Sequence, residues 1–205
     1  MEVEFLVRGM IIGFSIAAPI GPIGMLCIRR TLAEGRATGL AVGLGAASAD
    51  SIYASMAGFG LTLVSAFLVS QQVWLRLIGG GFLCYLGVKI FFETPAMKAA
   101  NVGGRGLLGA YTSTFFLTLT NPATIISFTA VFAGLGVASA GGDFLGASAL
   151  VVGVFFGSLL WTVILTSAVS MLRGRFTTQG MRWVNRLSGA TLMGFGIGAV
   201  ASLAF

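Results

Sequence analysis

The sequence predicts an all-α integral membrane protein of six transmembrane helices, arranged as two inverted three-helix repeats with broken first and fourth helices. Of its 205 residues, 57% are hydrophobic and only 9% are charged. A soluble domain would carry roughly 25% charged residues, so the surrounding solvent is membrane lipid. The repeat is predicted by a second observation, which is that one broken apolar segment occurs in each half of the chain.

Six apolar stretches are long enough to span a bilayer, which requires about 20 residues. They cover residues 5–28, 39–69, 74–92, 107–133, 144–172 and 183–205. The second is too long for an untilted span, so a kink is expected near Gly58–Gly60. The chain is expected to form one transmembrane domain, with a first repeat at 1–92, a linker at 93–106 and a second repeat at 107–205.

The first span contains the segment Ala18-Pro19-Ile20-Gly21-Pro22-Ile23-Gly24. Its two prolines remove two backbone donors, and each ring clashes with the carbonyl four residues earlier. Its glycines leave the freed carbonyls uncovered. Broken backbone survives at membrane depth only where protein or a water-filled cavity satisfies it.

The fourth span repeats this break in the segment Thr118–Thr124, which contains Asn121-Pro122. At an offset of 100 residues Gly9 aligns with Gly109 and Pro22 with Pro122, and a further match relates the third and sixth spans. Since each repeat holds three spans, the second copy must enter the membrane from the opposite side. Matching breaks in two halves point to the binding site of a secondary transporter.

The basic residues predict the orientation. Cytoplasmic loops of membrane proteins are enriched in Lys and Arg. Ten of the twelve cations fall in the first, third and fifth loops or at their edges: Arg29, Arg30, Arg36, Lys89, Lys98, Arg105, Arg173, Arg175, Arg182 and Arg186. Both termini are therefore expected on the non-cytoplasmic side, and the net charge of +6 is attributed to topology rather than to nucleic-acid binding.

Asp50 is the only acidic residue inside a predicted span. Counted from Gly39 it lies close to the middle of a hydrocarbon core of about 30 Å. A carboxylate there costs about 2.5–3.5 kcal/mol, so it requires a cavity, a partner or a proton. Tyr53 shares its helix face and could donate a hydrogen bond. The alternative is a structural ion pair with Arg76 or Arg186.

The two breaks are expected to meet Asp50 near the midplane. Exposed amides at the start of a half-helix attract a carboxylate, and Asp50 would attract an ammonium group. A small zwitterion is therefore the expected ligand. The residues predicted to bind substrate or couple ions are Asp50, Tyr53, Pro19, Gly21, Pro22, Thr120, Asn121, Pro122 and Thr124.

The composition argues against several other functions. The chain has no histidine, two cysteines and no nucleophile set, P-loop or dinucleotide fingerprint. We therefore expect no enzyme activity, no cofactor and no resident metal site.

The proline-glycine break, the stretch from Gly39 through Asp50 to Gly60, and Asn121-Pro122 together resemble the LysE/RhtB-type amino-acid exporters over essentially the whole chain. The resemblance implies export of an amino acid or related metabolite across the bacterial cytoplasmic membrane, driven by an ion gradient. It assigns the functional aspartate to Asp50 and the proline motif to Pro19, Gly21 and Pro22. We expect protons as the coupling ion, and leave homo-oligomer formation open.

Two other functions compete with this interpretation. One is a metal-cation exporter of the same broad superfamily. The other is a transmembrane thiol-electron carrier, which would need matching cysteines at both breaks. Cys27 follows the first break, but Ser127 occupies the corresponding position after the second.

Overall fold

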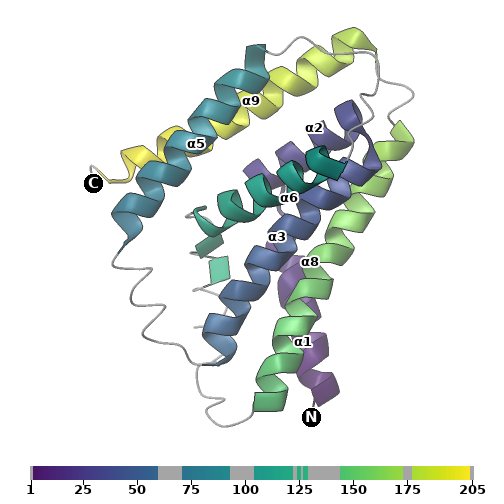
Figure 1. Ribbon diagram of the computed structural model, residues 1–205, viewed down its shortest axis with the longest axis vertical. Coiled ribbons are helices and arrows are strands. Elements are labelled where there is room, and N and C mark those ends of the chain that lie inside the picture. Colours follow the sequence, from purple (N-terminus) through teal and green to yellow (C-terminus); the bar gives the residue numbers. More distant parts are fainter. Residues whose placement is uncertain are drawn as a thin grey trace.

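The computed structural model describes residues 2–59, 71–92, 104–121, 124–125, 127–128, 144–172 and 177–203. Within these ranges the chain is helical and contains no strand (Figure 1). The helices are α1 (Glu2–Ala17), α2 (Pro22–Glu34), α3 (Arg36–Gly58), α5 (Gln72–Phe92), α6 (Gly104–Leu119), α8 (Phe144–Leu172) and α9 (Thr178–Ala201).

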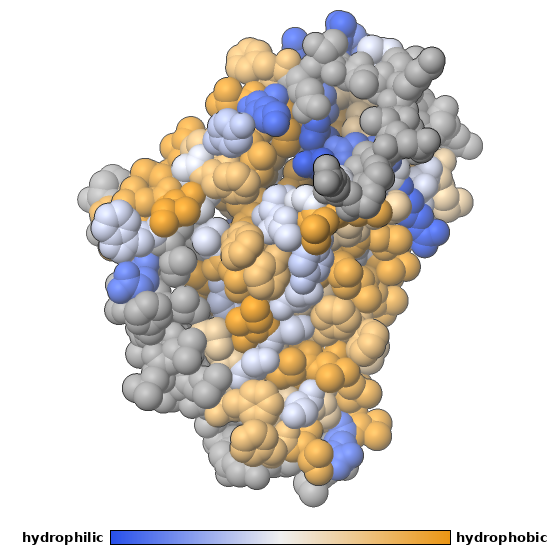
Figure 2. Space-filling model, viewed as in Figure 1, coloured by the Kyte–Doolittle hydropathy of each residue, from blue (hydrophilic) through white to orange (hydrophobic). Residues whose placement is uncertain are grey.

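An apolar exterior covers much of the molecule. Large hydrophobic side chains are exposed on several helices, among them Ile11, Trp74, Phe116 and Phe156. Figure 2 shows hydrophobic residues over much of the visible face, with hydrophilic ones mainly toward the ends of the helices. Among the described helices, α8 alone is long and apolar enough to cross a membrane by itself. Helices α1 and α2 meet that criterion together, as one span with a 79° bend.

Several helix boundaries differ from those expected. In the second predicted span, α3 ends at Gly58 with Phe59 as its C-cap, and residues 60–69 lie outside the described residues. Helix α6 ends at Leu119 because the Thr120–Asn121 turn interrupts it. Helix α9 begins at Thr178, earlier than residue 183, because the Thr177 hydroxyl accepts a hydrogen bond from the Gly180 amide and caps the first turn.

The helices pack as two groups. Helix α8 lies against α1 and α3, and α3 also packs on α6. The long helices α5 and α9 pack chiefly on each other and form a separate pair in Figure 1. Helix α2 contacts α3, α8 and α9, so it lies between the group and the pair. It joins α3 through Gly35, whose φ of 106° favours glycine.

Glycines bring α1 and α8 into backbone contact. A Cβ atom added at Gly9 or Gly13 would overlap backbone carbonyls of α8. A Cβ at Gly153 would overlap the Leu6 carbonyl of α1 and lie 2.9 Å from the Met10 amide. Such small-residue spacing lets two transmembrane helices approach closely.

The contact between α3 and α6 repeats this arrangement. A Cβ atom at Gly45 of α3 would overlap the Tyr111 carbonyl of α6 and lie 3.1 Å from the Phe115 amide. In both places a glycine faces a carbonyl and the amide one turn further along the partner helix. The α3–α6 and α1–α8 contacts are thus built in the same way.

The α5–α9 pair has its own reciprocal contact. A Cβ at Gly80 would lie 2.9 Å from the Gly196 carbonyl oxygen, and one at Gly196 would lie 2.6 Å from the Gly80 carbonyl oxygen. Gly87 and Gly189 face each other in the same reciprocal manner, at 2.8 and 2.7 Å. These two glycines of α5 have the same spacing as their two partners on α9. The pattern of glycine contacts is therefore symmetric between the two helices.

Candidate functional site

The first break separates α1 from α2 at residues 18–21. Here the Gly21 amide donates to the Pro19 carbonyl at 2.8 Å instead of continuing the helix. Pro22 opens α2 at a position where a missing amide hydrogen costs nothing. Gly21 caps α2 without a side-chain hydrogen bond, so the Ile23 and Gly24 amides at the start of α2 receive no side-chain cap.

The second break follows α6. The Asn121 amide donates to the Thr118 carbonyl at 3.2 Å, which closes a turn. The Asn121 carbonyl then accepts hydrogen bonds from the amides of Thr124 and Ile125, at 3.1 and 3.2 Å. Pro122, which the sequence predicts as the cause of this break, lies outside the described residues.

Asp50 lies on α3 where α8 crosses it, and only 4% of its surface is exposed. The Ser158 hydroxyl of α8 donates to its Oδ2 at 2.5 Å. The partner of the carboxylate is thus a neutral hydroxyl, and neither Arg76 nor Arg186, the candidates of the alternative interpretation, forms an ion pair with Asp50 among the described residues. Arg76 Nη1 instead donates to the Ser202 carbonyl and hydroxyl oxygens, both at 3.2 Å, while Arg186 is exposed on α9.

Tyr53 has a different partner from the one expected. Its hydroxyl donates to the Leu119 carbonyl at 2.5 Å rather than to Asp50. Leu119 lies in the last turn of α6, where carbonyls have no further amides along the helix to bond with. The Tyr53 ring stacks on Phe128 with centroids 5.5 Å apart. Tyr53 therefore connects α3 to both sides of the second break.

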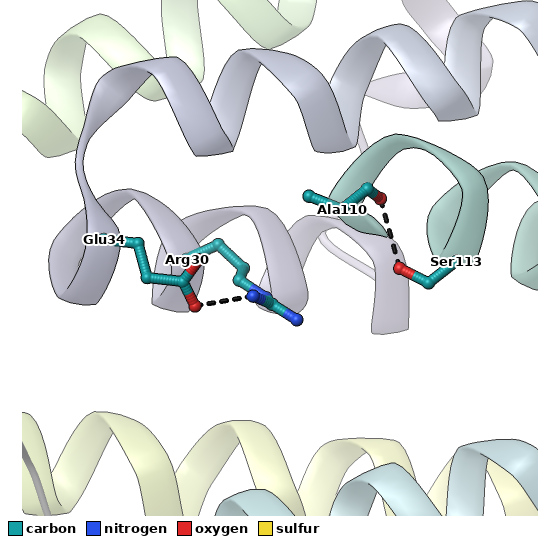
Figure 3. A network of polar contacts seen from close by, with 4 residues as sticks. All are labelled: Arg30, Glu34, Ala110 and Ser113. Atoms are coloured by element: carbon teal, nitrogen blue, oxygen red, sulfur yellow. Dashed lines mark hydrogen bonds and ion pairs between the residues drawn. The ribbon is translucent and has the colours of Figure 1, made fainter. Parts of the chain in front are cut away.

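Arg30, one of two arginines near the C-terminal end of α2, is paired within its own helix. Arg30 Nη1 donates to Glu34 Oε1 at 2.6 Å, one turn along the same helix (Figure 3). On the adjacent α6, the Ser113 hydroxyl donates to the Ala110 carbonyl at 3.2 Å, also within its own helix. These polar groups are paired within their helices and make no hydrogen bond to the carboxylate of Asp50.

A cavity of about 300 Å³ lies between the two breaks. Six of the predicted site residues line it, namely Pro19, Gly21, Pro22, Asp50, Asn121 and Thr124, whereas Tyr53 and Thr120 do not. Among its described lining residues, the carboxyl of Asp50 is the sole charged group. Its other walls are mainly apolar, including Trp161 and Phe195. The cavity can thus offer one acid and several hydrogen-bonding groups to a small polar molecule.

Four hydroxyl-bearing residues of the cavity were not predicted from the sequence: Thr118, Ser127, Ser158 and Thr162. Ser158, Thr162 and Thr166 follow each other at four-residue intervals on α8, whose residues are mostly apolar. That periodicity could have indicated a polar face toward α3. The Thr118 hydroxyl is buried and has no hydrogen-bond partner among the described residues, so it is available to a molecule in the cavity.

The two cysteines lie in different parts of the structure. The Cys27 thiol donates to the Gly39 carbonyl at 3.5 Å on the cavity wall, whereas Cys84 of α5 faces the Met193 carbonyl of α9 at 4.0 Å. Replacing both by serine is expected to leave the transport activity of the protein close to the wild-type level, because serine keeps the size and the donor. Efflux from proteoliposomes measures this. Loss of efflux in a correctly inserted double variant would indicate thiol chemistry.

Comparison with known proteins places the chain in a family. The LysE type translocator family model matches residues 14–202. YcgF of Bacillus subtilis (strain 168), which carries the name of an amino acid efflux protein, is 24% identical over 91% of this chain and 90% of its own length. The threonine efflux protein of Escherichia coli (strain K12) is 26% identical over 98% of this chain and its full length.

A third relative is the threonine efflux protein of Salmonella typhi, 29% identical over 78% of this chain and 79% of its own. No solved structure was found to match the chain. The family match extends over both breaks, Asp50 and the cavity wall formed by α8. The chain therefore belongs to the LysE type translocator family.

Proposed function

We propose that this membrane transporter exports a small amino acid from the bacterial cytoplasm in exchange for protons. The observation that carries the proposal is a single carboxylate, Asp50, buried in a cavity between two broken helices. A cavity of about 300 Å³ lies at the lower end of the range for small-molecule sites. The relatives named for amino acid or threonine efflux favour an amino acid as cargo.

The proposed binding mode uses both ends of the cavity. The substrate carboxylate would lie at the start of α2, where Ile23 and Gly24 line the wall and helix amides attract anions. The ammonium would lie at Asp50. Thr118 and Thr124 would offer hydroxyls to polar atoms of the substrate. Pairing both charges of the zwitterion reduces the cost of removing it from water.

The proposed coupling follows from a single acid. Protonated Asp50 has no charge with which to bind an ammonium group, so proton and substrate exclude one another. An acidic outer side loads the proton, and the cytoplasmic side releases it and admits the amine. This exclusive binding is sufficient for antiport when the two halves rock about a central site.

The inverted repeat is part of the proposal. The Gly21 and Asn121 carbonyls each accept from the amide four residues later, in Met25 and Ile125, so the two breaks begin their helices alike. Residues at corresponding positions of the two breaks line the cavity in pairs: Gly21 with Asn121, Gly24 with Thr124, and Cys27 with Ser127. The matched glycine contacts of α3–α6 and α1–α8 support the same symmetry.

The cavity also suggests which side is open. It is lined by α3 from Val42 to Asp50 and by α8 from Ser158 to Leu165. Beyond Asp50, a hydrophobic cluster that includes Tyr53, Phe128 and Leu150 fills the space. If the Arg36 end of α3 is cytoplasmic, this conformation presents the site toward the cytoplasm.

The orientation can be tested with single cysteines in a cysteine-free background. Ala37 and Gln179 are exposed near the proposed cytoplasmic ends, and Val3 is exposed near the proposed outer end. We expect an impermeant thiol reagent to label the Val3→Cys variant in intact cells, but to label A37C and Q179C only after permeabilisation. Labelling of either of the last two in intact cells would reverse the orientation.

The competing functions fit the cavity less well. A metal-cation exporter would need several hard or nitrogen ligands, and the cavity offers one carboxylate while the chain has no histidine. A thiol-electron carrier would need a second thiol in the cavity. Among the described lining residues Cys27 supplies one thiol, but the corresponding residue of the second break is Ser127.

The decisive experiment loads purified protein in proteoliposomes with labelled amino acids and imposes a pH gradient. Efflux of a small neutral amino acid that depends on the gradient is expected. If every amino acid stays inside the proteoliposomes with or without a pH gradient, while a divalent cation leaves them, the metal-exporter alternative is favoured.

A further inference from the structure

Ser158 is the direct partner of Asp50, although it was not among the predicted site residues. Ser158 is 2% exposed and lines the cavity, and its hydroxyl donates to Asp50 Oδ2 at 2.5 Å. The two residues are 108 positions apart in the chain. Their helices, α3 and α8, cross at this point and contribute one polar side chain each.

The same separation relates other features of α3 and α8. Gly45 and Gly153 are equally far apart, and each faces a carbonyl and the following-turn amide of its neighbour, α6 or α1. Tyr53 follows Asp50 by three residues, as Trp161 follows Ser158.

These aromatic residues also have matching surroundings. Tyr53 hydrogen bonds to Leu119 in the last turn of α6. Trp161 packs edge-on against Phe14 in the last turn of α1, with ring centroids 5.5 Å apart. A small residue, a polar residue and an aromatic residue thus recur in order on α3 and α8. The small and aromatic residues contact α6 or α1, and the two polar residues contact each other.

From this correspondence we infer that Asp50 and Ser158 occupy equivalent positions on either side of a pseudo-two-fold axis through the cavity. The coupling carboxylate can therefore be supplied from either half of the chain. Ser158 is the positioning residue that holds the Asp50 carboxylate toward the cavity. With the residues exchanged, a serine at position 50 would donate to an aspartate at 158 in the same way. The inference rests on the proposed role of Asp50 in amino-acid efflux.

The test exchanges the two residues. D50S alone is expected to reduce pH-gradient-driven efflux in proteoliposomes to the level of protein-free liposomes. The exchange variant D50S/S158D is expected to recover it by about tenfold or more over D50S, since contacting residues of this kind couple strongly. The recovered efflux should depend on the pH gradient with the same sign as in the wild type.

A matched control distinguishes position from charge. Thr162 lies one turn along α8 and also lines the cavity, so D50S/T162D adds a carboxylate to the same wall at a non-equivalent place. We expect no recovery there. Equal recovery in D50S/T162D and D50S/S158D would show that any negative charge suffices, and would overturn the inferred equivalence.

The result is also separable from the proposed function. Wild-type efflux with an inactive, normally inserted exchange variant would overturn the equivalence alone, whereas an inactive wild type would overturn the proposed function. Should the exchange variant fail to insert, a carboxylate can be introduced after folding. D50S/S158C in a C27S/C84S background is reacted with iodoacetate, which adds a protonatable carboxylate to the thiol, labelling is verified by mass, and efflux should return only in the labelled protein.

Discussion

Replacement of Asp50 by asparagine is expected to abolish pH-gradient-driven efflux while leaving the protein inserted at wild-type levels. Asparagine keeps the size of the side chain, and its carbonyl oxygen can still accept the hydrogen bond that the Ser158 hydroxyl donates at 2.5 Å. It removes the negative charge that would bind an ammonium group and the group that would carry a proton. The variant should therefore fold normally but lose the coupling of efflux to the pH gradient.

The measurement is efflux of labelled amino acid from proteoliposomes at several pH gradients. In the wild type, acidifying the side opposite the substrate should accelerate efflux, and acidifying the substrate side should slow it because protons then compete for Asp50. The D50N rate should be independent of both. A matched control is E4Q on α1, which also converts a carboxylate to an amide, but at a surface position paired with the exposed Arg8. Wild-type pH dependence in D50N would make Asp50 structural.

Replacement of Gly196 by leucine is expected to cause a large loss of stability. A Cβ atom there would already lie 2.6 Å from both the Gly80 carbonyl oxygen and the Cys84 sulfur. Because α5 and α9 pack mainly on each other, a leucine would force the pair apart. Overpacking of this kind costs about 1–3 kcal/mol and occasionally more.

Gly194 provides the control on the same helix. A Cβ atom at Gly194 meets no atom of the described residues within 4 Å, and the position is exposed. G194L should therefore retain its thermal unfolding midpoint in detergent and remain monodisperse in size-exclusion chromatography, while G196L should unfold at a lower temperature or aggregate. Similar midpoints for the two variants would contradict the proposed tight packing of α5 on α9.

The broken first helix could be predicted from the sequence because its cause is local. Pro22 lacks an amide hydrogen and Gly21 offers no side chain, whatever surrounds them, and the structure bends the chain by 79° at this point. The burial of Asp50 was likewise predictable, because lipid cannot solvate the carboxylate of a single acidic residue in an apolar stretch, so that residue must face the protein interior. Its 4% exposure confirms the expectation.

The partner of Asp50 was decided by tertiary structure. An aspartate within a span requires a hydrogen-bond donor, but the sequence alone does not distinguish Arg76 from Ser158 in that role. Because α8 packs against α3, Ser158 is the residue that donates to Asp50. Arg76 instead donates to Ser202, where α5 contacts α9. The choice depends on which helices touch, and helix spacing along the chain does not contain that information.

Tyr53 illustrates the same limit. Its place on the Asp50 face of α3 predicts a hydrogen bond to that carboxylate, yet its hydroxyl donates to the Leu119 carbonyl across the helix contact. By itself the sequence determined that this protein is helical, lies in a membrane and contains a broken helix with an acid nearby, because these follow from local backbone chemistry and solvation. Only the tertiary structure decided which groups meet around the cavity, because long-range packing sets those pairs.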